Sequence, residues 1–407
     1  MKIRCCLAIF LSGFVCAHAA FGQESSVPQD SSASPRSPGR PTIGLVLEGG
    51  GALGLAHAGA LRWFEENHIP IDYIAGTSMG GLVGGFYATG MSAAEIEDFI
   101  KNTNWTRSLR NELPYQARSF RRKEDQRDYP NDLEFGLKGG INFPSGFNSG
   151  QQVGLILDRV ALPYSDLKSF DELPTPFRCV ATDLVSGEPK IFDSGSLSEA
   201  LRSTMSLPAI FSPVRRDGHI YVDGGLIENL PVDVAKAMGA DIVIAVHLET
   251  EPLNPKESLS AFSVLQRSIS VVISANELES MKKADILVRV HTEKYTALDF
   301  QASKELMDLG YAGTNEKAAL LKKLSLNQQD WDQYIEQRKS RQRPVPIPQF
   351  IEVTGTAPVI AQGIERSLAD NVGKPVNFHR IDSDLTDVTG LGRFARAGFQ
   401  LTKRDGQ

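Results

Sequence analysis

The sequence predicts an α/β fold with a mostly parallel central sheet. Short apolar runs, beginning with Ile43–Leu47, have the continuous hydrophobicity of strands that are buried on both faces. Stretches with helical spacing of apolar residues separate these runs. Strands that alternate with helices in this way are typical of parallel sheets.

The expected strands follow one another along most of the chain. They lie at Ile43–Leu47, Tyr73–Ala75, Phe177–Ala181, Ile220–Val222, Ile242–Val246 and Ile286–Val290. The clearest helices between them are Leu55–Asn67, Met79–Tyr87, Pro231–Met238 and Ala261–Lys283.

The stretch from Trp105 to Gly150 interrupts this alternation. It is polar, and its basic residues are Arg107, Arg110, Arg118, Arg121, Arg122 and Lys123. A long irregular insertion in a compact domain is often a lid or a binding loop. For the charges alone, a solvated surface loop is the favoured interpretation.

The N-terminal residues 1–22 have the pattern of a secretory signal peptide. A basic start, Met1–Arg4, precedes the apolar run Cys5–Val15, which is too short to span a bilayer, and small residues follow at Ala17-His-Ala19. The mature chain would keep only Cys179 and form no internal disulfide. We therefore expect export to a bacterial envelope, either periplasm, outer membrane or cell surface, or secretion.

The rest of the chain divides into four segments. Residues 23–40 are rich in Ser and Pro and are expected to be a disordered linker. Residues 41–325 form the α/β domain, residues 326–346 a helical linker, and residues 347–407 a separate small unit. The formal net charge of −6 shows no basic excess, so nucleic acid is not expected as a partner.

The small C-terminal unit is expected to combine strands and helices. Strands are predicted at Phe350–Thr354 and Ala397–Leu401, with helices at Val359–Asn371 and Ile381–Thr389 between them. The unit is one strand short of a common α+β module, so we expect either a truncated domain or an interaction module.

The segment Gly76-Thr-Ser78-Met-Gly80 has the Gly-x-Ser-x-Gly form of a nucleophile elbow. It joins an apolar run to an Ala/Gly-rich helix, and such a turn exposes the serine hydroxyl. The glycines allow the tight backbone, and the helix directs its N-terminal N–H groups at the reaction centre. Ser78 is therefore a candidate nucleophile, whereas the simpler alternative is an ordinary turn of small residues.

A glycine-rich loop, Gly49-Gly-Gly51-Ala-Leu-Gly54, follows the first strand. Its unhindered N–H groups at a helix N-terminus can hold a phosphate or an oxyanion. A dinucleotide site needs an acidic residue at the end of the second strand, but Asp72 lies at its start. The dinucleotide interpretation is therefore disfavoured.

Asp223 ends an apolar run and precedes Gly224 and Gly225, which places it like a catalytic group at a strand end. An Asx-turn aspartate is the simpler alternative. A serine nucleophile needs a base, and the candidate histidines are His57, His219, His247 and His291. No motif supports any of them, so a Ser–Asp dyad is the more economical prediction.

Several motifs in this order resemble the patatin-like phospholipase family. They are the Gly49–Gly54 loop, Gly-Thr-Ser-Met-Gly-Gly, Asp223-Gly-Gly225 and the supporting stretch Asn229-Leu-Pro-Val232. The resemblance covers roughly residues 41–325 and implies a three-layer αβα domain. It implies Ser78 as nucleophile, Asp223 as base, and an oxyanion hole from Gly49, Gly50, Gly51 and Gly54, with no metal or cofactor.

One position departs from the family pattern. The family often carries Arg or Lys where this chain has Leu53, so the oxyanion would rest on backbone N–H groups and the helix dipole. Arg202 is a weaker candidate for supplying positive charge nearby. The departure concerns the rate more than the reaction type.

The unit after residue 346 resembles a POTRA domain, as found in patatin-type autotransporters. The resemblance rests on Ile351-Glu-Val-Thr-Gly355 and Asn371-Val-Gly-Lys-Pro-Val376, each followed by a predicted helix. It implies an outer-membrane barrel or an assembly partner.

The sequence therefore leaves three candidate functions. The first is an exported serine hydrolase for lipid acyl esters, of phospholipase A, lysophospholipase or esterase type, acting at a membrane surface. The second is an envelope assembly module with a weakly active or inactive hydrolase domain. The third is a nucleotide-binding enzyme that uses the Gly49–Gly54 loop.

Overall fold

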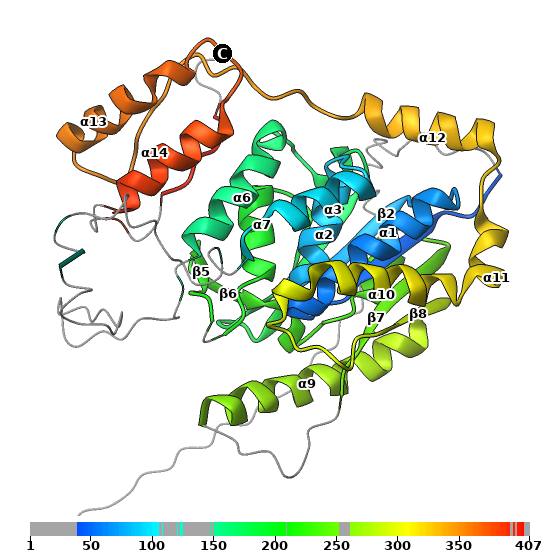
Figure 1. The fold of residues 1–407 in the computed structure, drawn as a ribbon. Helices are drawn as coiled ribbons and strands as arrows, with labels where there is room; N and C mark the ends of the chain where they lie inside the picture. The colour runs from blue at the N-terminus through cyan, green and yellow to red at the C-terminus, as the bar shows by residue number, and fades with distance from the viewer. Residues whose placement is uncertain are drawn as a thin grey trace, which may run out of the picture. The chain divides into compact units, whose positions relative to one another are not determined.

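The computed structural model describes residues 39–105, 108, 120, 123–124, 148, 150–208, 210–251, 261–390, 394 and 397–402 (Figure 1). The predicted signal peptide, almost all of the Ser/Pro-rich linker and most of the basic insertion lie outside these residues. The chain divides into two units, Met1–Arg36 and Ser37–Gln407, and every described residue belongs to the second. No helix of the described part is both long and apolar enough to cross a bilayer.

The core of the molecule is a mixed sheet with the strand order β5-β6-β3-β2-β1-β7-β8, and β4 pairs with β3. Its strands are β1 (Ile43–Leu47), β2 (Tyr73–Thr77), β3 (Phe177–Asp183), β4 (Glu188–Phe192), β5 (Val214–Arg216), β6 (His219–Asp223), β7 (Ile242–Glu249) and β8 (Ile286–His291). Strands β3, β2, β1, β7 and β8 run parallel, whereas β4, β5 and β6 join antiparallel. The prediction of an α/β fold is confirmed, with an antiparallel extension at one side.

Alternate side chains of the strands point into two separate hydrophobic clusters. On β1, Leu45 and Leu47 belong to the larger cluster, whereas Val46 belongs to the smaller one. On β7, Ile244 and Ala245 divide in the same way. Because successive strand side chains face opposite sides, the sheet is covered on both faces, which gives three layers.

Helices supply the two outer layers. The larger cluster is closed by α1 (Ala56–Glu66), α2 (Ser78–Ala88), α3 (Ala93–Asn102), α7 (Leu197–Thr204) and α10 (Ser303–Asn315), and the smaller one by α8 (Val232–Ala237), beside which lies α9 (Ala261–Lys283) (Figure 1). The other α-helices of the described residues are α6 (Gln151–Ala161), α11 (Ala318–Leu321), α12 (Gln328–Ser340), α13 (Pro358–Leu368) and α14 (Phe378–Gly390).

The C-terminal segment differs from the sequence prediction. Its helices α13 and α14 form, but residues 350–354 and 397–401 are not strands. Ala397 instead exchanges hydrogen bonds with the Gln151 side chain, at 2.6 and 2.7 Å, and Phe399 N–H donates to Asp158 Oδ2 at 3.2 Å. These backbone groups are bound to side chains of α6 and not to a neighbouring strand. The strands predicted at Phe350–Thr354 and Ala397–Leu401 are therefore wrong. The resemblance to a POTRA domain is not confirmed.

Candidate active site

Ser78 lies at the junction of β2 and α2 in a strained backbone conformation. Its φ is 53°, in the left-handed region that a non-glycine residue rarely adopts. The flanking glycines permit the turn, because a Cβ on Gly76 would lie 2.6 Å from Gly80 O and one on Gly80 only 2.2 Å from Leu47 O. The structure therefore has the geometry of a nucleophile elbow.

Asp223, the last residue of β6, meets this serine. Ser78 Oγ donates to Asp223 Oδ2 at 2.5 Å, and Gly225 N–H donates to Asp223 Oδ1 at 2.9 Å. The antiparallel pairing of β6 with β3 brings the aspartate beside the elbow, and a Cβ on Gly224 would lie 2.2 Å from Val180 O. Two residues that the sequence predicted separately are thus in direct contact.

The Asp223 carboxyl is only 3% exposed, and this changes its acidity. Burial raises the pKa of Asp223 from 3.8 to about 6, although the hydrogen bonds from Ser78 and from Gly225 N–H act in the opposite direction. A carboxylate with such a pKa is a stronger base than an exposed aspartate and is still ionised at neutral pH.

Thr204, at the end of α7, supports the elbow and was not found by the sequence analysis. Ser78 N–H donates to Thr204 Oγ1 at 2.8 Å, and the threonine hydroxyl donates to Val180 O at 2.5 Å. The strained backbone of Ser78 is thereby tied to the middle of β3. No motif surrounds Thr204, so only the fold reveals its position.

The glycine loop lies directly beside Ser78. A Cβ on Gly49 would come within 3.0 Å of Ser78 Cβ, and one on Gly54 within 2.6 Å of Met79 Cβ. Gly49 N–H already donates to Asn229 O at 3.3 Å. The N–H groups of Gly50 and Gly51 have no hydrogen-bond acceptor among the described residues, so they are the loop donors left for a ligand.

None of the candidate histidines hydrogen-bonds to Ser78 or Asp223 in the described part of the chain. His57 Nε2 donates to Glu48 O at 2.7 Å, and burial lowers the pKa of His57 to about 4. The other three bind carboxylates: His219 binds Asp183, His247 binds Glu48, and His291 binds Glu249. The site therefore pairs serine with aspartate alone.

Leu53 and Arg202 are both buried, with different consequences. Leu53 belongs to the hydrophobic core, so the loop carries no cation at that position. Arg202 donates to Ser206 Oγ at 2.6 Å and to Ser212 O at 3.0 Å, while Ser206 O accepts Asp223 N–H at 3.0 Å. Arg202 therefore stabilises the segment around Ser206, whose backbone carbonyl binds Asp223 N–H.

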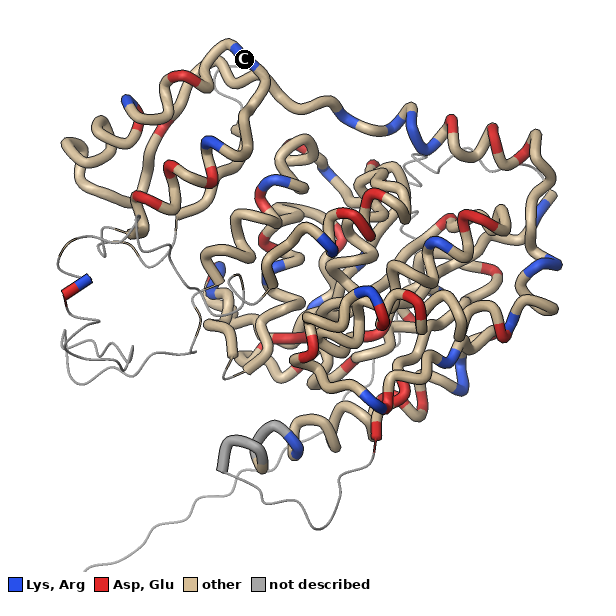
Figure 2. Tube along the Cα trace, viewed as in Figure 1, with Lys and Arg blue, Asp and Glu red and all other residues tan. Residues whose placement is uncertain are grey.

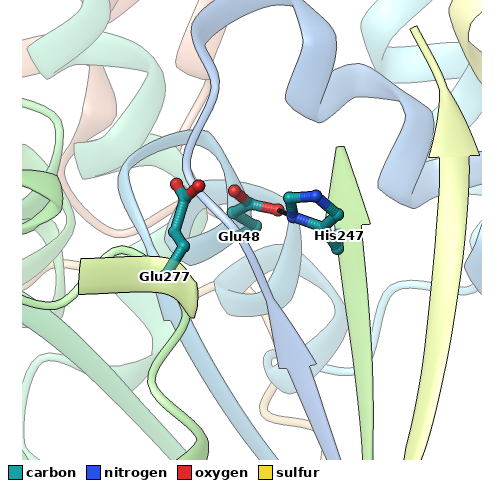
Figure 3. Close-up of side chains that lie close together, drawn as sticks. All are labelled: Glu48, His247 and Glu277. Atoms are coloured by element: carbon teal, nitrogen blue, oxygen red, sulfur yellow. Dashed lines mark hydrogen bonds and ion pairs between the residues drawn. The ribbon is translucent and has the colours of Figure 1, made fainter. Parts of the chain in front are cut away.

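Two clusters of carboxylates and imidazoles have the residue types of metal ligands. Glu48, His247 and Glu277 lie behind the glycine loop and are largely buried (Figure 3), whereas Glu249, His291 and Glu293 are more exposed. Neither cluster contacts Ser78 through a described hydrogen bond. The sequence analysis considered His247 and His291 only as candidate bases and did not single out Glu48 or Glu277.

The fold and the site define a class of protein. A serine on a strained elbow, in contact with a buried aspartate and next to a glycine loop on a three-layer α/β sheet, is the arrangement of a serine hydrolase. Residues 45–236 match the family model described as patatin-like phospholipase. This part of the chain is similar to patatin-like phospholipase domains, and the geometry of its site is that of a serine hydrolase.

Curated relatives agree with this assignment. A patatin-like phospholipase domain-containing protein of Caenorhabditis elegans is 27% identical over 394 residues, which cover 85% of this chain and 27% of that protein. Patatin-like phospholipase domain-containing protein 7 of Rattus norvegicus is 29% identical over 66% of this chain and 20% of its own length. Lysophospholipase NTE1 of Meyerozyma guilliermondii is 28% identical over 67% of this chain and 19% of its own length. The chain thus spans about a fifth to a quarter of these relatives.

Two solved structures match at lower sequence identity. VipD from Legionella pneumophila has a TM-score of 0.40 at 14% identity, with 86% of this chain and 80% of that chain covered. The type III effector ExoU has a TM-score of 0.35, also at 14% identity, with 87% and 70% covered.

Proposed function

We propose that this chain hydrolyses acyl esters of lipids by a Ser–Asp dyad, as a phospholipase A, lysophospholipase or lipid esterase. The observation that carries the proposal is the 2.5 Å hydrogen bond from Ser78 Oγ to the buried Asp223 Oδ2. The names of the curated relatives, which include a lysophospholipase, support lipid substrates.

The reaction proceeds in two halves. Asp223 accepts the proton of Ser78 while Oγ attacks the ester carbonyl carbon, forming a tetrahedral intermediate. When the intermediate collapses, the carbon–oxygen bond to the alcohol breaks and Asp223 returns the proton to the departing oxygen. Water, deprotonated by Asp223, then cleaves the acyl-serine, releases the fatty acid and restores the Ser78 hydroxyl.

Backbone N–H donors stabilise the negative charge on the oxygen of the tetrahedral intermediate. The N–H groups of Gly50 and Gly51 and the N-terminus of α2 are the groups proposed to receive the oxyanion. Losing one oxyanion donor typically costs about 10²–10³ in rate. With Leu53 in place of a cation, these backbone donors carry the whole of this role.

Kinetics on a fluorogenic acyl ester test the dyad. Ser78→Ala and Asp223→Asn should each lower kcat by at least about 10³, and the double variant should lose no more, because the two residues act as one unit. Ser367→Ala, on α13, is the matched control and should retain wild-type rates. Additive losses, or full activity in either single variant, would contradict the dyad.

We also propose that the outer face of α9 meets the lipid surface. Val271, Val272 and Leu278 are 56%, 50% and 59% exposed. The charged residues of α9 are Arg267, Glu277, Glu279, Lys282 and Lys283, and most of its described length is tan in Figure 2. Exposed apolar side chains on a helix beside a lipid hydrolase site favour a membrane surface as partner.

Vesicle binding tests the role of α9. The variant with Val271→Asp and Val272→Asp should co-sediment several-fold less with phosphatidylcholine vesicles than wild type. Val359→Asp, at an exposed site on α13, should co-sediment like wild type. If this control loses binding equally, or the α9 variant loses none, α9 is not the contact surface.

Export remains a proposal that rests on the signal pattern of residues 1–22. The envelope assembly role has less support, because the extended segment 397–401 binds side chains of its own chain. Cell fractionation of the full-length protein tests export: a mature protein that lacks residues 1–22 should be found outside the cytoplasm.

A further inference from the structure

Helix α9 has an inverted pattern of burial. Among its side chains that the structure describes, Glu277 is the only buried one, at 8% exposure. A surface helix normally buries apolar residues and exposes charged ones. Burying a carboxyl group costs free energy unless hydrogen-bond partners surround it. Packing alone therefore does not explain why Glu277 is buried, and its hydrogen bonds have to be considered.

Those contacts lead directly to the glycine loop. The side-chain amide of Asn229 donates to Glu277 Oε1, to Glu48 Oε1 at 3.3 Å and to Gly49 O at 3.2 Å. Gly49 N–H in turn donates to Asn229 O at 3.3 Å. Asn229 therefore binds both the N–H and the C=O of Gly49. Gly49 directly precedes Gly50 and Gly51, whose N–H groups are free for a ligand.

The amide of Asn229 has two protons for three acceptors. Glu277 is the nearest acceptor, and the two longer contacts share the remaining proton. Without Glu277, the amide would keep only the two longer contacts, to Glu48 Oε1 and Gly49 O. Glu277 thus provides the shortest of the three contacts that orient Asn229 toward the loop.

Glu48 fixes the other side of this arrangement. Its Oε2 accepts Leu248 N–H at 2.7 Å and lies 2.7 Å from His247 Nδ1, so it is tied to β7. Figure 3 shows Glu48 between Glu277 and His247. The two carboxyl groups share a buried site, which favours one proton held between them.

We propose that Glu277 is a positioning residue for the oxyanion loop, which it holds through Asn229. The inference rests on the proposed hydrolase function. A divalent cation bound by Glu48, His247 and Glu277 is the competing occupant, but it would have to displace the contact between Glu48 and His247.

The shared proton has a consequence for pH. Burial and the nearby charge of Glu48 raise the pKa of Glu277, while Asn229 and His247 act in the opposite direction. The charged groups around His247 also include Arg289 and Glu249. At alkaline pH the proton is lost, the two carboxylates repel each other, and the hold on Gly49 weakens. We therefore expect kcat to decline at high pH.

The test compares Glu277→Gln with Glu277→Ala on a soluble fluorogenic ester. Glutamine reproduces the protonated carboxyl, so E277Q should keep kcat within about threefold and lose the alkaline decline. E277A should lower kcat about 10²-fold, the effect of one oxyanion donor, with little change in KM. Glu279→Gln, exposed on the same helix, is the matched control and should leave the pH profile unchanged.

A second measurement does not depend on activity. Because the folded-state pKa of Glu277 is raised, wild-type stability should fall relative to E277Q as pH rises above about 4.5. Identical pH profiles of kcat and of melting temperature in wild type and E277Q would overturn the proposal. So would stoichiometric divalent metal in the purified wild-type protein that is lost in E277Q. Hydrolysis absent in wild type, with the stability difference present, would overturn the proposed function and leave only the proton-sharing pair.

Discussion

At the scale of single residues, Asp223 is a group whose function opposes stability. Its carboxyl is almost fully buried, and its pKa rises from 3.8 to about 6. That difference corresponds to roughly 3 kcal/mol of folding free energy lost when the group is ionised. A buried charge kept at such a cost is typical of active sites.

Replacing the charge should therefore stabilise the protein while abolishing catalysis. The acid form is favoured in the folded state, so stability declines as pH rises from about 3.8 through about 6. Asp223→Asn should be more stable than wild type by up to roughly 3 kcal/mol at pH 8, and nearly equal at pH 4. Urea unfolding at the two pH values checks this; a less stable variant at pH 8 would refute it.

The same carboxyl sets the acid limb of the activity. Because the base must be ionised to accept the Ser78 proton, kcat/KM should fall about tenfold per pH unit below about 6. Initial rates on a soluble ester between pH 4.5 and 8 measure this limb. An acid limb centred near 4 would mean that burial does not raise the pKa of Asp223 in solution.

The residues that sequence analysis found are those whose role is marked by local motifs. Ser78, Asp223 and the glycine loop stand in short patterns, and the structure brings them together. Thr204 is 126 positions from Ser78 and stands in no pattern, so only folding reveals the contact. The same holds for Glu277, which reaches the loop through Asn229.

At the scale of elements, two glycines illustrate different requirements. Gly80 lies where α2 approaches the end of β1, and an added Cβ would be 2.2 Å from Leu47 O. That contact is with backbone, which cannot move aside cheaply. Gly363, in α13, has nothing within 4 Å of the same hypothetical atom.

Alanine at these two positions should therefore act in opposite directions. Gly80→Ala should lower the free energy of unfolding by at least about 2 kcal/mol, because the helix must shift away from the sheet. Gly363→Ala should raise it by up to about 1 kcal/mol, since alanine is the better helix former. Denaturant unfolding of both variants measures these changes. Equal stability of Gly80→Ala and wild type would contradict the close approach of α2 to Leu47 O.

The elements that could be predicted are the buried ones. Residues 43–47 form a strand with the predicted bounds, because a continuous apolar run leaves few alternatives. β4 was missed because it is largely exposed and has no apolar run. Residues 397–401 have the composition of a strand, but their N–H groups find side-chain acceptors on and just after α6. Pairing partners depend on the whole fold and cannot be read locally.

At the scale of the whole molecule, α12 is tied to the hydrolase domain. Its buried Arg338 donates to Tyr87 O and to Met91 O, and the guanidinium lies 3.6 Å from the centre of the Tyr87 ring. The C-terminal helices continue this docking through a cluster formed by Leu155, Leu162, Leu368, Val376, Ile381 and Leu385. The segment predicted as a helical linker at residues 326–346 thus contains a helix, α12, that packs against the hydrolase domain.

Removing Arg338 should destabilise the domain that carries the active site. Arg338→Ala removes one donor from Tyr87 O, which keeps Gly90 N–H, and one from Met91 O, and it removes the contact with the Tyr87 ring. The loss should cost about 2–4 kcal/mol of unfolding free energy. Lys339→Ala, an exposed neighbour, should change stability by less than about 0.5 kcal/mol. A thermal melt that shows equal shifts for both would mean that α12 is not part of the folded core.

The central claim is that Ser78 is the nucleophile and Asp223 its base. The most direct measurement is labelling with a fluorophosphonate, followed by peptide mass mapping across pH. We predict one label per chain on the peptide that contains Ser78, none in Ser78→Ala, and a labelling rate that rises through pH 6 and is strongly reduced in Asp223→Asn. Stoichiometric label on another residue, with Ser78 unmodified, would contradict the account.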